Sequence, residues 1–541
     1  MNYKLRQLVA ATLAGTALLG FGATAFADTT DDIVNALIAK GVLTEEEGAL
    51  LINARELEKT TKAKTPVAKQ KDGLVIESPD GNFSFTPTGR VHTDYRFYDY
   101  DDGESNVIPG TVSVPATVAF NGSNAAAVAA NTAAIAAANA TNNAIIGNSI
   151  PNAASNIGAD TFDIRRARIG FKAKYKEFYE AELNADISVG ANTSVTSTNW
   201  DVAYFNVAWW KPVQFRFGLF KMPMNLEEVT SSNNIDFMER SYVNALAPQK
   251  EIGAMIHGVP FTGTTYALAV SNGSGAKQAE TDIREDGKDV IGRVTANFAE
   301  LMTVPDKEAI YHVGASFSTG DQPQGGIGVN GRTESRGATF FRAPVLTNGA
   351  PKGFQSIDRT RIGLEGAVAI RQFKLQGEWL QQSNEFDTNT RGYSLDTTAW
   401  YAEALWAITG EKYADGYKNG VMGSIKPLKD FDPATFSGGA WEIGLRYNEF
   451  DASDYNTIGI EQGTTLGAAD ASITTKAAGF AKAKSYTAGV KFLPNSNMRF
   501  MLNYVKTNFS DVIGGATGGI VLNNKRIDDE QAVLMRAQWM F

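Results

Sequence analysis

The 541-residue sequence contains no cysteine, and this absence excludes disulfide frameworks and thiolate metal sites. It has only three histidines, His92, His257 and His312, and they lack the close spacing that a metal site requires. We find no phosphate-binding loop of the P-loop type and no nucleophile elbow. The residues therefore predict no metal and no cofactor and disfavour an enzyme. A hydrolase with a serine or aspartate nucleophile beside a histidine is the alternative.

Long apolar segments are also absent after the first 27 residues. The run LVAATLAGTALLGFGATAFA follows Lys4 and Arg6 and ends in AFA, a small-x-small pattern that a signal peptidase recognises. Residues 1–27 are therefore predicted to be a signal peptide, with a membrane anchor as the alternative. No later stretch reaches the roughly 18 apolar residues of a spanning helix, so a membrane-spanning form of this chain would have to be a β-barrel.

Positive charge is not in excess either. The formal net charge is −9, and loss of the two basic residues of the signal peptide makes the mature chain more negative still. Proteins that bind nucleic acids usually carry a basic excess, so this balance argues against a nucleic-acid partner. It does not by itself indicate which ions the protein prefers.

Residues 28–60 have the pattern of two short helices. Gly41 is placed to end the first helix, and Thr44 with Glu47 has the spacing of a capping box that opens the second. The basic, proline-containing residues 61–73 are predicted to be a linker. The helical segment is too short to enclose a core, so it is expected to self-associate or to pack against a partner.

Residues 74–541 alternate between apolar and polar side chains with a period of two. In RRARIGFKAKY, for example, Ile169 and Phe171 alternate with Arg168 and Lys172. About sixteen such segments can be placed, an even number within the range of single-chain outer-membrane barrels. We therefore predict an all-β fold, a transmembrane antiparallel β-barrel of about 16 strands, preceded by a short α-helical, coiled-coil-like segment.

The links between these segments alternate between short and long, as in a barrel with tight turns at one rim and long loops at the other. The tight turns are YKEF, WKPV, VPFTG, IRQF and LPNSN. Residues 409–438 fall where a short turn is due, so either they contain a further hairpin or this turn is elaborated. Residues 99–160 carry an Ala/Asn-rich, low-complexity stretch and are predicted to be a long outer loop, with a helical insert as the alternative.

The charged face of each strand must point into the lumen, because an arginine or lysine facing lipid costs about 2–4 kcal/mol at the bilayer midplane. A ring of cations in a lumen selects for anions. Carboxylates such as Asp94, Glu180 and Glu365 share this face, so the cations could instead do no more than solvate a wide pore. The cations predicted to line the pore are Arg90, Arg96, Arg166, Arg168, Lys172, Lys174, Arg216, Arg293, Arg361, Lys374, Arg446 and Arg536.

The last segment, EQAVLMRAQWMF, keeps the same alternation up to its final residue. Met535, Trp539 and Phe541 alternate with Arg536 and Gln538. In a barrel the first three face lipid, with Trp539 and Phe541 in the interfacial aromatic girdle. This strand is then expected to close the barrel against GRVHTDYRFY.

Four stretches carry a family resemblance. They are FRFGLFKMPMNLEEVTSSNNIDFMERS followed by EIGAMIHG, ALWAITGEKYADGY leading to GGAWEIGLRYNEFD, AGVKFLPNSNMRFMLNYVKTNFSD, and MRAQWMF. In this order and spacing they resemble the phosphate-selective porin O and P family of Gram-negative outer membranes. The resemblance implies a homotrimer of sixteen-stranded barrels in outer-membrane lipid that passes small inorganic anions.

The resemblance has further implications for single segments. Residues 221–250 are expected to fold inward as a constriction loop, in which Lys221, Arg240 and Lys250 either face the anion or pair with glutamates of the loop. The two leading helices resemble a periplasmic coiled-coil preface that would aid trimerisation. The closing MRAQWMF resembles the aromatic-terminated strand that barrel-assembly machinery reads, so that Trp539 and Phe541 form the expected assembly signal.

The sequence thus predicts a passive porin of the Gram-negative outer membrane for small anions, with phosphate or polyphosphate as candidate solutes. The acidic mature chain and the mixed lumen charges depart from a purely cationic lumen. Two alternatives therefore stay open, a non-selective general porin and a structural barrel that tethers the envelope.

Overall fold

The structure is a computed structural model. It divides into two units, residues 1–70 with 76–84 and residues 71–75 with 85–541, which are described separately. The predicted signal peptide and most of the predicted outer loop 99–160 lie outside the described residues. The described residues are 34–35, 37–62, 66–71, 73–102, 149–150, 157–188, 199–273, 287–302, 308–322, 329–346, 357–387, 392–456, 473–475, 477–513, 518–522 and 525–541.

The smaller unit contains helix α3 (Glu45–Lys62), which opens on the expected capping box. The backbone N–H of Thr44 donates to Glu47 Oε2 at 3.0 Å, and the backbone N–H of Glu47 donates to Thr44 Oγ1 at 3.2 Å. Gly41 ends the preceding helical turn with a φ of 69°, a left-handed value that glycine adopts at little cost. Strands β1 (Val67–Lys71) and β2 (Gly73–Glu77) follow, so strand structure begins within the range expected to be a linker.

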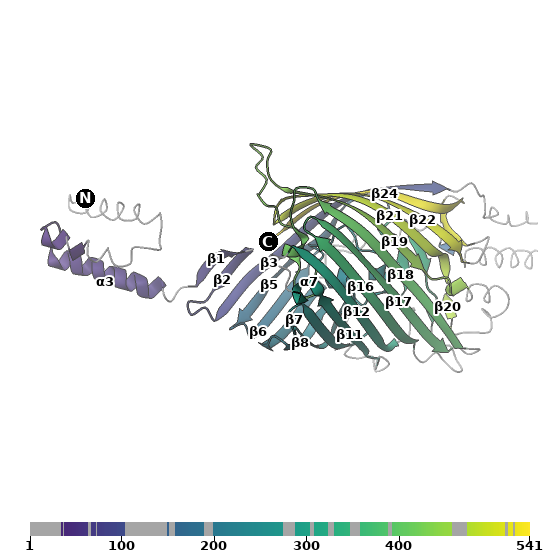
Figure 1. The fold of residues 1–541 in the computed structure, drawn as a ribbon, viewed down its shortest axis with the longest axis horizontal. Coiled ribbons are helices and arrows are strands. Elements are labelled where there is room, and N and C mark those ends of the chain that lie inside the picture. Colours follow the sequence, from purple (N-terminus) through teal and green to yellow (C-terminus); the bar gives the residue numbers. More distant parts are fainter. Residues whose placement is uncertain are drawn as a thin grey trace, which may run out of the picture. The chain divides into compact units, whose positions relative to one another are not determined.

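The larger unit is a closed antiparallel barrel of sixteen strands (Figure 1). Each strand pairs with the next along the chain, and the last pairs with the first, with Arg536 opposite Asp94. The strands are β3 (Phe83–Asp102), β5 (Thr161–Tyr175), β6 (Tyr179–Asp186), β7 (Asn199–Trp210), β8 (Val213–Lys221), β9 (Lys250–Gly258), β10 (Thr264–Ser271), β11 (Asp289–Asn297), β12 (Ala309–Gln322), β16 (Ile357–Ile370), β17 (Phe373–Asp387), β18 (Gly392–Ala407), β19 (Ala440–Asp451), β21 (Ala478–Asn495), β22 (Met498–Val512) and β24 (Lys525–Met540).

The period-two pattern gives each strand one apolar and one polar face. On β22, Phe500, Leu502 and Tyr504 are 44%, 45% and 45% exposed on the outside, whereas Met501 and Asn503 between them are buried. Outward apolar side chains match the lipid that surrounds a barrel, and inward polar side chains match its lumen. The predicted alternation of the sequence is therefore confirmed on this strand.

Five tight turns lie where they were predicted, at one end of the barrel that we call the short-turn rim. They separate β5 from β6, β7 from β8, β9 from β10, β16 from β17, and β21 from β22. The opposite end, the long-link rim, has one short connection as well, because only residues 388–391 separate β17 from β18.

Residues 408–439 form an elaborated turn at the short-turn rim rather than a further barrel hairpin. Strands β18 and β19 pair directly with each other, with Ala407 opposite Glu442. Between them the turn contains only the 3-10 helix η2 (Tyr413–Gly416) and two isolated bridges. A similar but shorter departure is helix α7 (Phe298–Leu301) between β11 and β12.

Several links fold back onto the barrel interior and supply its apolar packing. Phe340 and Phe341 are fully buried against Phe450 and other rings in one large cluster, and Leu226 packs with Tyr413 in a second. The elements of these links are α5 (Leu226–Val229), α6 (Val243–Leu246), β13 (Asn330–Arg332), β14 (Thr339–Arg342) and β15 (Val345–Leu346). The other short strands are β4 (Ser149–Ile150), β20 (Ile473–Thr475) and β23 (Gly519–Leu522). Within the described part of the chain, no helix combines the length and the apolar character needed to cross a bilayer.

Candidate functional site

The link between β8 and β9, residues 222–249, crosses the lumen; we call it the inward loop. The backbone N–H groups of Leu226 and Glu227 donate to the two carboxylate oxygens of Glu378 on β17, at 2.9 and 2.7 Å. Further along, the Tyr242 hydroxyl lies 2.5 Å from Ser485 Oγ on β21. The loop thus leaves β8 and is fastened to the opposite wall, within the range 221–250 predicted to form a constriction loop.

All four acidic side chains of the inward loop are ion-paired. Glu227 lies 3.0 Å from Arg446, and Glu228 lies 3.7 Å from Lys221. The other two are Asp236, which lies 2.6 Å from Lys374, and Glu239. The carboxylates of this loop therefore fasten it to the wall and add little net negative charge to the lumen.

Glu239 is the most heavily shared of these carboxylates. It lies 2.6 Å from Arg96, 2.8 Å from Arg165 and 3.1 Å from Arg536, which belong to three adjacent strands around the closure of the barrel. Burial alone would raise the pKa of the Glu239 carboxyl, but the arginines hold that pKa well below its usual range. Glu239 therefore stays ionised at neutral pH and ties the inward loop to three strands of the wall through ion pairs.

Most of the predicted pore-lining cations are paired with carboxylates of the wall or of a link. Arg446, for example, is 3% exposed and pairs with Glu334 as well as with Glu227. Arg216 instead stacks over the ring of Tyr204, with its guanidinium carbon 4.3 Å from the ring centroid. The other pairs are Arg168 with Asp186 and Asp201, Lys172 with Glu182, Lys174 with Glu180, Arg293 with Glu365, and Arg361 with Asp289.

Lys221 and Arg240 hold the inward loop chiefly through its backbone. Lys221 Nζ donates to the carbonyl oxygens of Glu228 and Thr230, and Arg240 donates to those of Glu227 and Thr230. The alternative expected from the sequence was pairing with glutamates of the loop, and both residues do lie near Glu228, at 3.7 Å for Lys221 and 3.8 Å for Arg240. Lys250, at the start of β9, pairs with a carboxylate of β7 rather than with a glutamate of the loop.

Two adjacent arginines of β5 both turn inward. Phe162 and Ile164 are exposed on the outer face, and so is Ile169, which has the opposite parity in the sequence. The alternation therefore changes phase between these positions, as at a β-bulge, and this brings both Arg165 and Arg166 into the lumen. Strict alternation missed Arg165, although two consecutive arginines within a strand are a usable signal of such a phase change.

A few lumen cations form no ion pair within the part of the chain that the structure describes. Arg166 is 6% exposed, and its Nε and Nη1 have no hydrogen-bond partner among the described residues. Arg90 Nη1 donates to the hydroxyl of Ser232 at 2.9 Å. Arg336, on the link between β12 and β16, forms no ion pair within the described ranges, although it lies within the electrostatic influence of Glu239 and of Arg165. The sequence did not identify Arg336, because it lies outside the alternating strands.

The link that carries Arg336 also reaches into the lumen. The carbonyl oxygen of Ser335 accepts from Arg96 Nη1 at 2.6 Å, and Glu334 pairs with Arg446 on the opposite side. Arg336 itself has a φ of 64°, an uncommon value for a residue other than glycine. This strained backbone lies where its own link and the inward loop meet three strands, β3, β5 and β24. Arg336 is thereby held near Arg96 and Arg165, which are ion-paired with Glu239.

Trp539 and Phe541, the expected assembly signal, lie on the outer face of the closing strand. They are 51% and 44% exposed, and their ring centroids are 5.1 Å apart. Arg536 and Gln538, which precede them on the same strand, are buried in the lumen. The predicted sidedness of this strand is confirmed.

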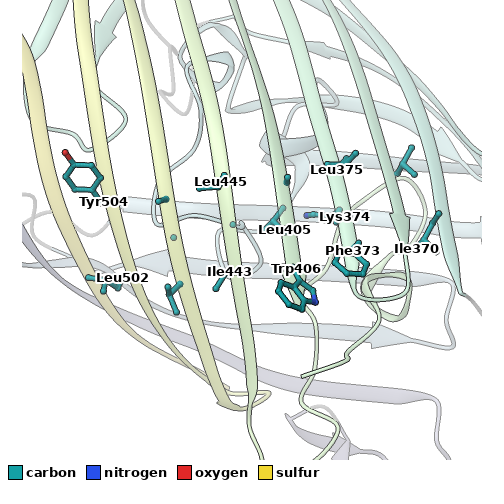
Figure 2. A pocket seen from close by; sticks show the side chains of 16 residues that line it. Ile370, Phe373, Lys374, Leu375, Leu405, Trp406, Ile443, Leu445, Leu502 and Tyr504 are labelled. Atoms are coloured by element: carbon teal, nitrogen blue, oxygen red, sulfur yellow. The ribbon is translucent and has the colours of Figure 1, made fainter. Parts of the chain in front are cut away.

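An apolar hollow lies on the outer wall of the barrel. Figure 2 shows it lined by apolar side chains such as Leu375, Leu445 and Leu502, which share the outward face of β17, β19 and β22. Lys374 borders it only through its backbone, since its ammonium group is turned to Asp236 in the lumen. An apolar hollow of this kind has no group that could bind a small anion, so the candidate site is the lumen beside the inward loop.

Comparison with known proteins identifies the family of this chain. Residues 148–541 match the family described as phosphate-selective porin O and P. Porin O of Pseudomonas aeruginosa is 25% identical over 509 residues, which cover 89% of this chain and 94% of that protein. The anion-selective porin from Comamonas acidovorans is 12% identical with a TM-score of 0.45, over 85% of this chain and 100% of that one. Pseudomonas putida OprB is 8% identical with a TM-score of 0.46, over 85% of this chain and 95% of that one. Because the family match spans more than half of its length, the chain belongs to the phosphate-selective porin O and P family and is an outer-membrane porin of a Gram-negative bacterium.

Proposed function

We propose that the barrel is a passive diffusion channel that prefers anions, with phosphate among its solutes, and that it carries out no chemical step. The observation that supports this proposal is the imbalance of unpaired charge beside the inward loop. The acidic side chains of that loop are all ion-paired, whereas Arg90, Arg166 and Arg336 form no ion pair among the described residues. An anion that enters the lumen meets positive charge that fixed carboxylates do not neutralise.

Oxyanions are the solutes that suit arginine best. A guanidinium group presents several N–H donors in a planar fork, which matches the oxygens of phosphate or a carboxylate. Among the described residues the buried Nε and Nη1 of Arg166 have no acceptor, so this guanidinium keeps hydrogen-bonding capacity that the described part of the protein does not use. The family description names phosphate selectivity, which supports phosphate as the first solute to test.

The inward loop is proposed to be the constriction. Its fastening to the opposite wall by paired carboxylates supports a loop that holds its position while ions pass. A homotrimer in outer-membrane lipid is also proposed, on the family resemblance.

The test is ion selectivity in planar bilayers. The purified protein is placed between potassium chloride solutions of unequal concentration, and the reversal potential is measured; then phosphate replaces chloride on one side. We expect a reversal potential of the sign given by anion preference, and a phosphate current or a block of the chloride current. A cation-selective potential would overturn the proposal, a potential near zero would favour a general porin, and the absence of conductance would favour an envelope tether.

A further inference from the structure

The elaborated turn 408–439 has two limbs on different sides of the barrel wall. Its inner limb, residues 413–425, is packed inside the barrel, where the Tyr417 hydroxyl lies 2.8 Å from His312 Nδ1 and the Gly420 carbonyl accepts from Arg293 at 2.8 Å. Its outer limb, residues 426–439, is largely exposed. The turn therefore crosses the short-turn rim. Its inner limb is surrounded by the lumen, whereas its outer limb lies outside the lumen.

The tip of the outer limb, residues 428–437, is an ordered structure. Asp432 accepts from the backbone N–H of Ala434 and from the hydroxyl of Thr435, both at 2.9 Å, and its own N–H donates to the Ser437 carbonyl at 2.8 Å. This cap holds Phe436 at a φ of 49°, a conformation that bulky residues rarely adopt, with its ring 86% exposed. Leu428 at the other end of the tip is 74% exposed.

A row of aromatic rings joins this tip to the outer wall of the barrel. Trp441 on β19 stacks on Phe492 on β21 with centroids 4.5 Å apart, and Phe492 meets Phe431 at 5.3 Å. Phe431 in turn lies 5.9 Å from Phe436. Gly439, with a φ of 76°, makes room for this row, because a Cβ there would lie 2.5 Å from the Phe492 ring. The tip is therefore continuous with the side of the barrel that faces lipid.

We propose that the tip 428–437 is a lipid anchor that lies in the headgroup region of the periplasmic leaflet, with Leu428 and Phe436 turned toward the acyl chains of phospholipids. Trp441 begins the row on the lipid-facing wall, and aromatic side chains concentrate where such a wall meets the headgroups. The backbone N–H of Phe431 donates to the Pro494 carbonyl at 2.7 Å, which ties the tip to the end of β21 at this level. Because both limbs belong to one turn, lipid that holds the outer limb also steadies the inner limb in the lumen.

The absence of native cysteine allows a single fluorescent probe to be placed at the tip. The full chain with Phe436→Cys is labelled with the environment-sensitive dye NBD and reconstituted into vesicles of phosphatidylethanolamine and phosphatidylglycerol. The matched control is Asn419→Cys on the inner limb, an exposed residue that also has a positive φ, of 50°. Both residues are exposed and outside the strands, so folding of the barrel is expected for both, as a heat-modifiable band on a gel checks.

The proposal predicts different surroundings for the two probes. At position 436 the emission should lie at shorter wavelength, nitroxide lipids labelled near the headgroup should quench it, and iodide should quench it several-fold less than at position 419. Equal quenching of both probes by iodide, without quenching by nitroxide lipid, would overturn the proposal and leave the tip in the aqueous periplasm. Cross-linking of Phe436→Cys between copies by a short bismaleimide would also overturn it, in favour of a contact between protomers. Leu428→Cys repeats the test at a second position.

Discussion

At the scale of single residues, the arginines of the lumen are of two kinds. Some are ion-paired with carboxylates and stabilise the fold, and others form no ion pair among the described residues. Arg446 and Arg166 are almost equally buried, at 3% and 6% exposure. Arg446 is paired with Glu227 and Glu334, and loss of one member of such a buried set leaves charges uncompensated. Among the described residues Arg166 has no such partner, and we therefore expect its charge to act on ions in the pore.

Replacing Arg166 by glutamine tests this distinction. We expect the ratio of anion to cation permeability, obtained from the reversal potential, to fall several-fold, because one unpaired positive charge is lost from the lumen. The free energy of unfolding should change by less than about 1 kcal/mol, since no partner is left unpaired. Arg166→Lys keeps the charge and serves as the control, which should retain the selectivity. If the glutamine and lysine variants have the same selectivity, Arg166 does not act through its charge.

The sequence predicts the side of the sheet on which a charge lies better than it predicts its partner. Alternation correctly turned Arg96, Arg293 and Arg536 inward. Most of their partners could not be read from it, because these lie far away in the chain, on other strands or on the inward loop: Arg536 and Glu239 are separated by 297 positions, and Arg293 and Glu365 by 72. Arg165 was missed for a different reason, since a change of phase within β5 depends on how two strands meet and not on local composition.

At the scale of elements, Glu239 contacts more arginines of the wall than the other acidic residues of the inward loop do. Glu239 joins Arg96, Arg165 and Arg536 at hydrogen-bonding distances. Glu228 on the same loop lies 3.7 Å from Lys221 and 3.8 Å from Arg240, too far for a direct hydrogen bond. The two glutamates therefore form a matched pair for testing what fastens the loop.

We predict that Glu239→Gln increases both the anion preference and the current fluctuations of the open channel. The change removes the negative charge that three arginines share, and it weakens the attachment of the loop to the wall. Glu228→Gln should alter both quantities far less. Single-channel recording of the two variants in the same salt solution makes the comparison. Equal effects of the two substitutions would show that charge anywhere on the loop, and not the shared contact at Glu239, controls the channel.

The turns illustrate which elements sequence can predict. The five tight turns were located correctly because their short length and the strands on both sides are local features. For the turn 408–439, a further hairpin and an elaborated turn fitted the sequence equally well. Its inner limb is held by contacts such as that of Gly420 with Arg293 and of Ser424 with Arg499, which only the closed barrel provides.

At the scale of the whole molecule, the barrel is complete only when its first and last strands pair. Arg536 on β24 donates to both carboxylate oxygens of Asp94 on β3, at 2.6 and 2.7 Å, across 442 positions of sequence. Until this contact forms, both strands present unpaired edges, and contacts over such separations are slow to form. We therefore expect the residues at the seam where these two strands meet to affect assembly as well as structure.

Phe541 completes the seam at the short-turn rim. Its backbone N–H donates to the Gly89 carbonyl at 3.1 Å, and its oxygen accepts from the Gly89 N–H at 3.0 Å. Its ring lies over Gly89 so closely that a Cβ there would be 2.2 Å from the ring. We propose that this residue acts in assembly, in line with its expected role as part of an assembly signal, because it contributes both backbone pairing and an aromatic ring at the lipid interface.

Deletion of Phe541 should reduce the amount of folded barrel in the outer membrane, measured as the heat-modifiable band, without changing the ion selectivity of the barrels that do form. Phe541→Tyr keeps the ring and should assemble normally. Gly89→Leu leaves Phe541 in the chain but displaces its ring, so it separates packing at the seam from recognition by the assembly machinery. If the deletion variant does not assemble and Gly89→Leu does, the main role of Phe541 is recognition by the assembly machinery. If neither variant assembles, packing of the Phe541 ring against Gly89 is needed. Normal assembly of the deletion variant would contradict both roles, because the lumen contacts of Arg536 would then suffice to close the barrel.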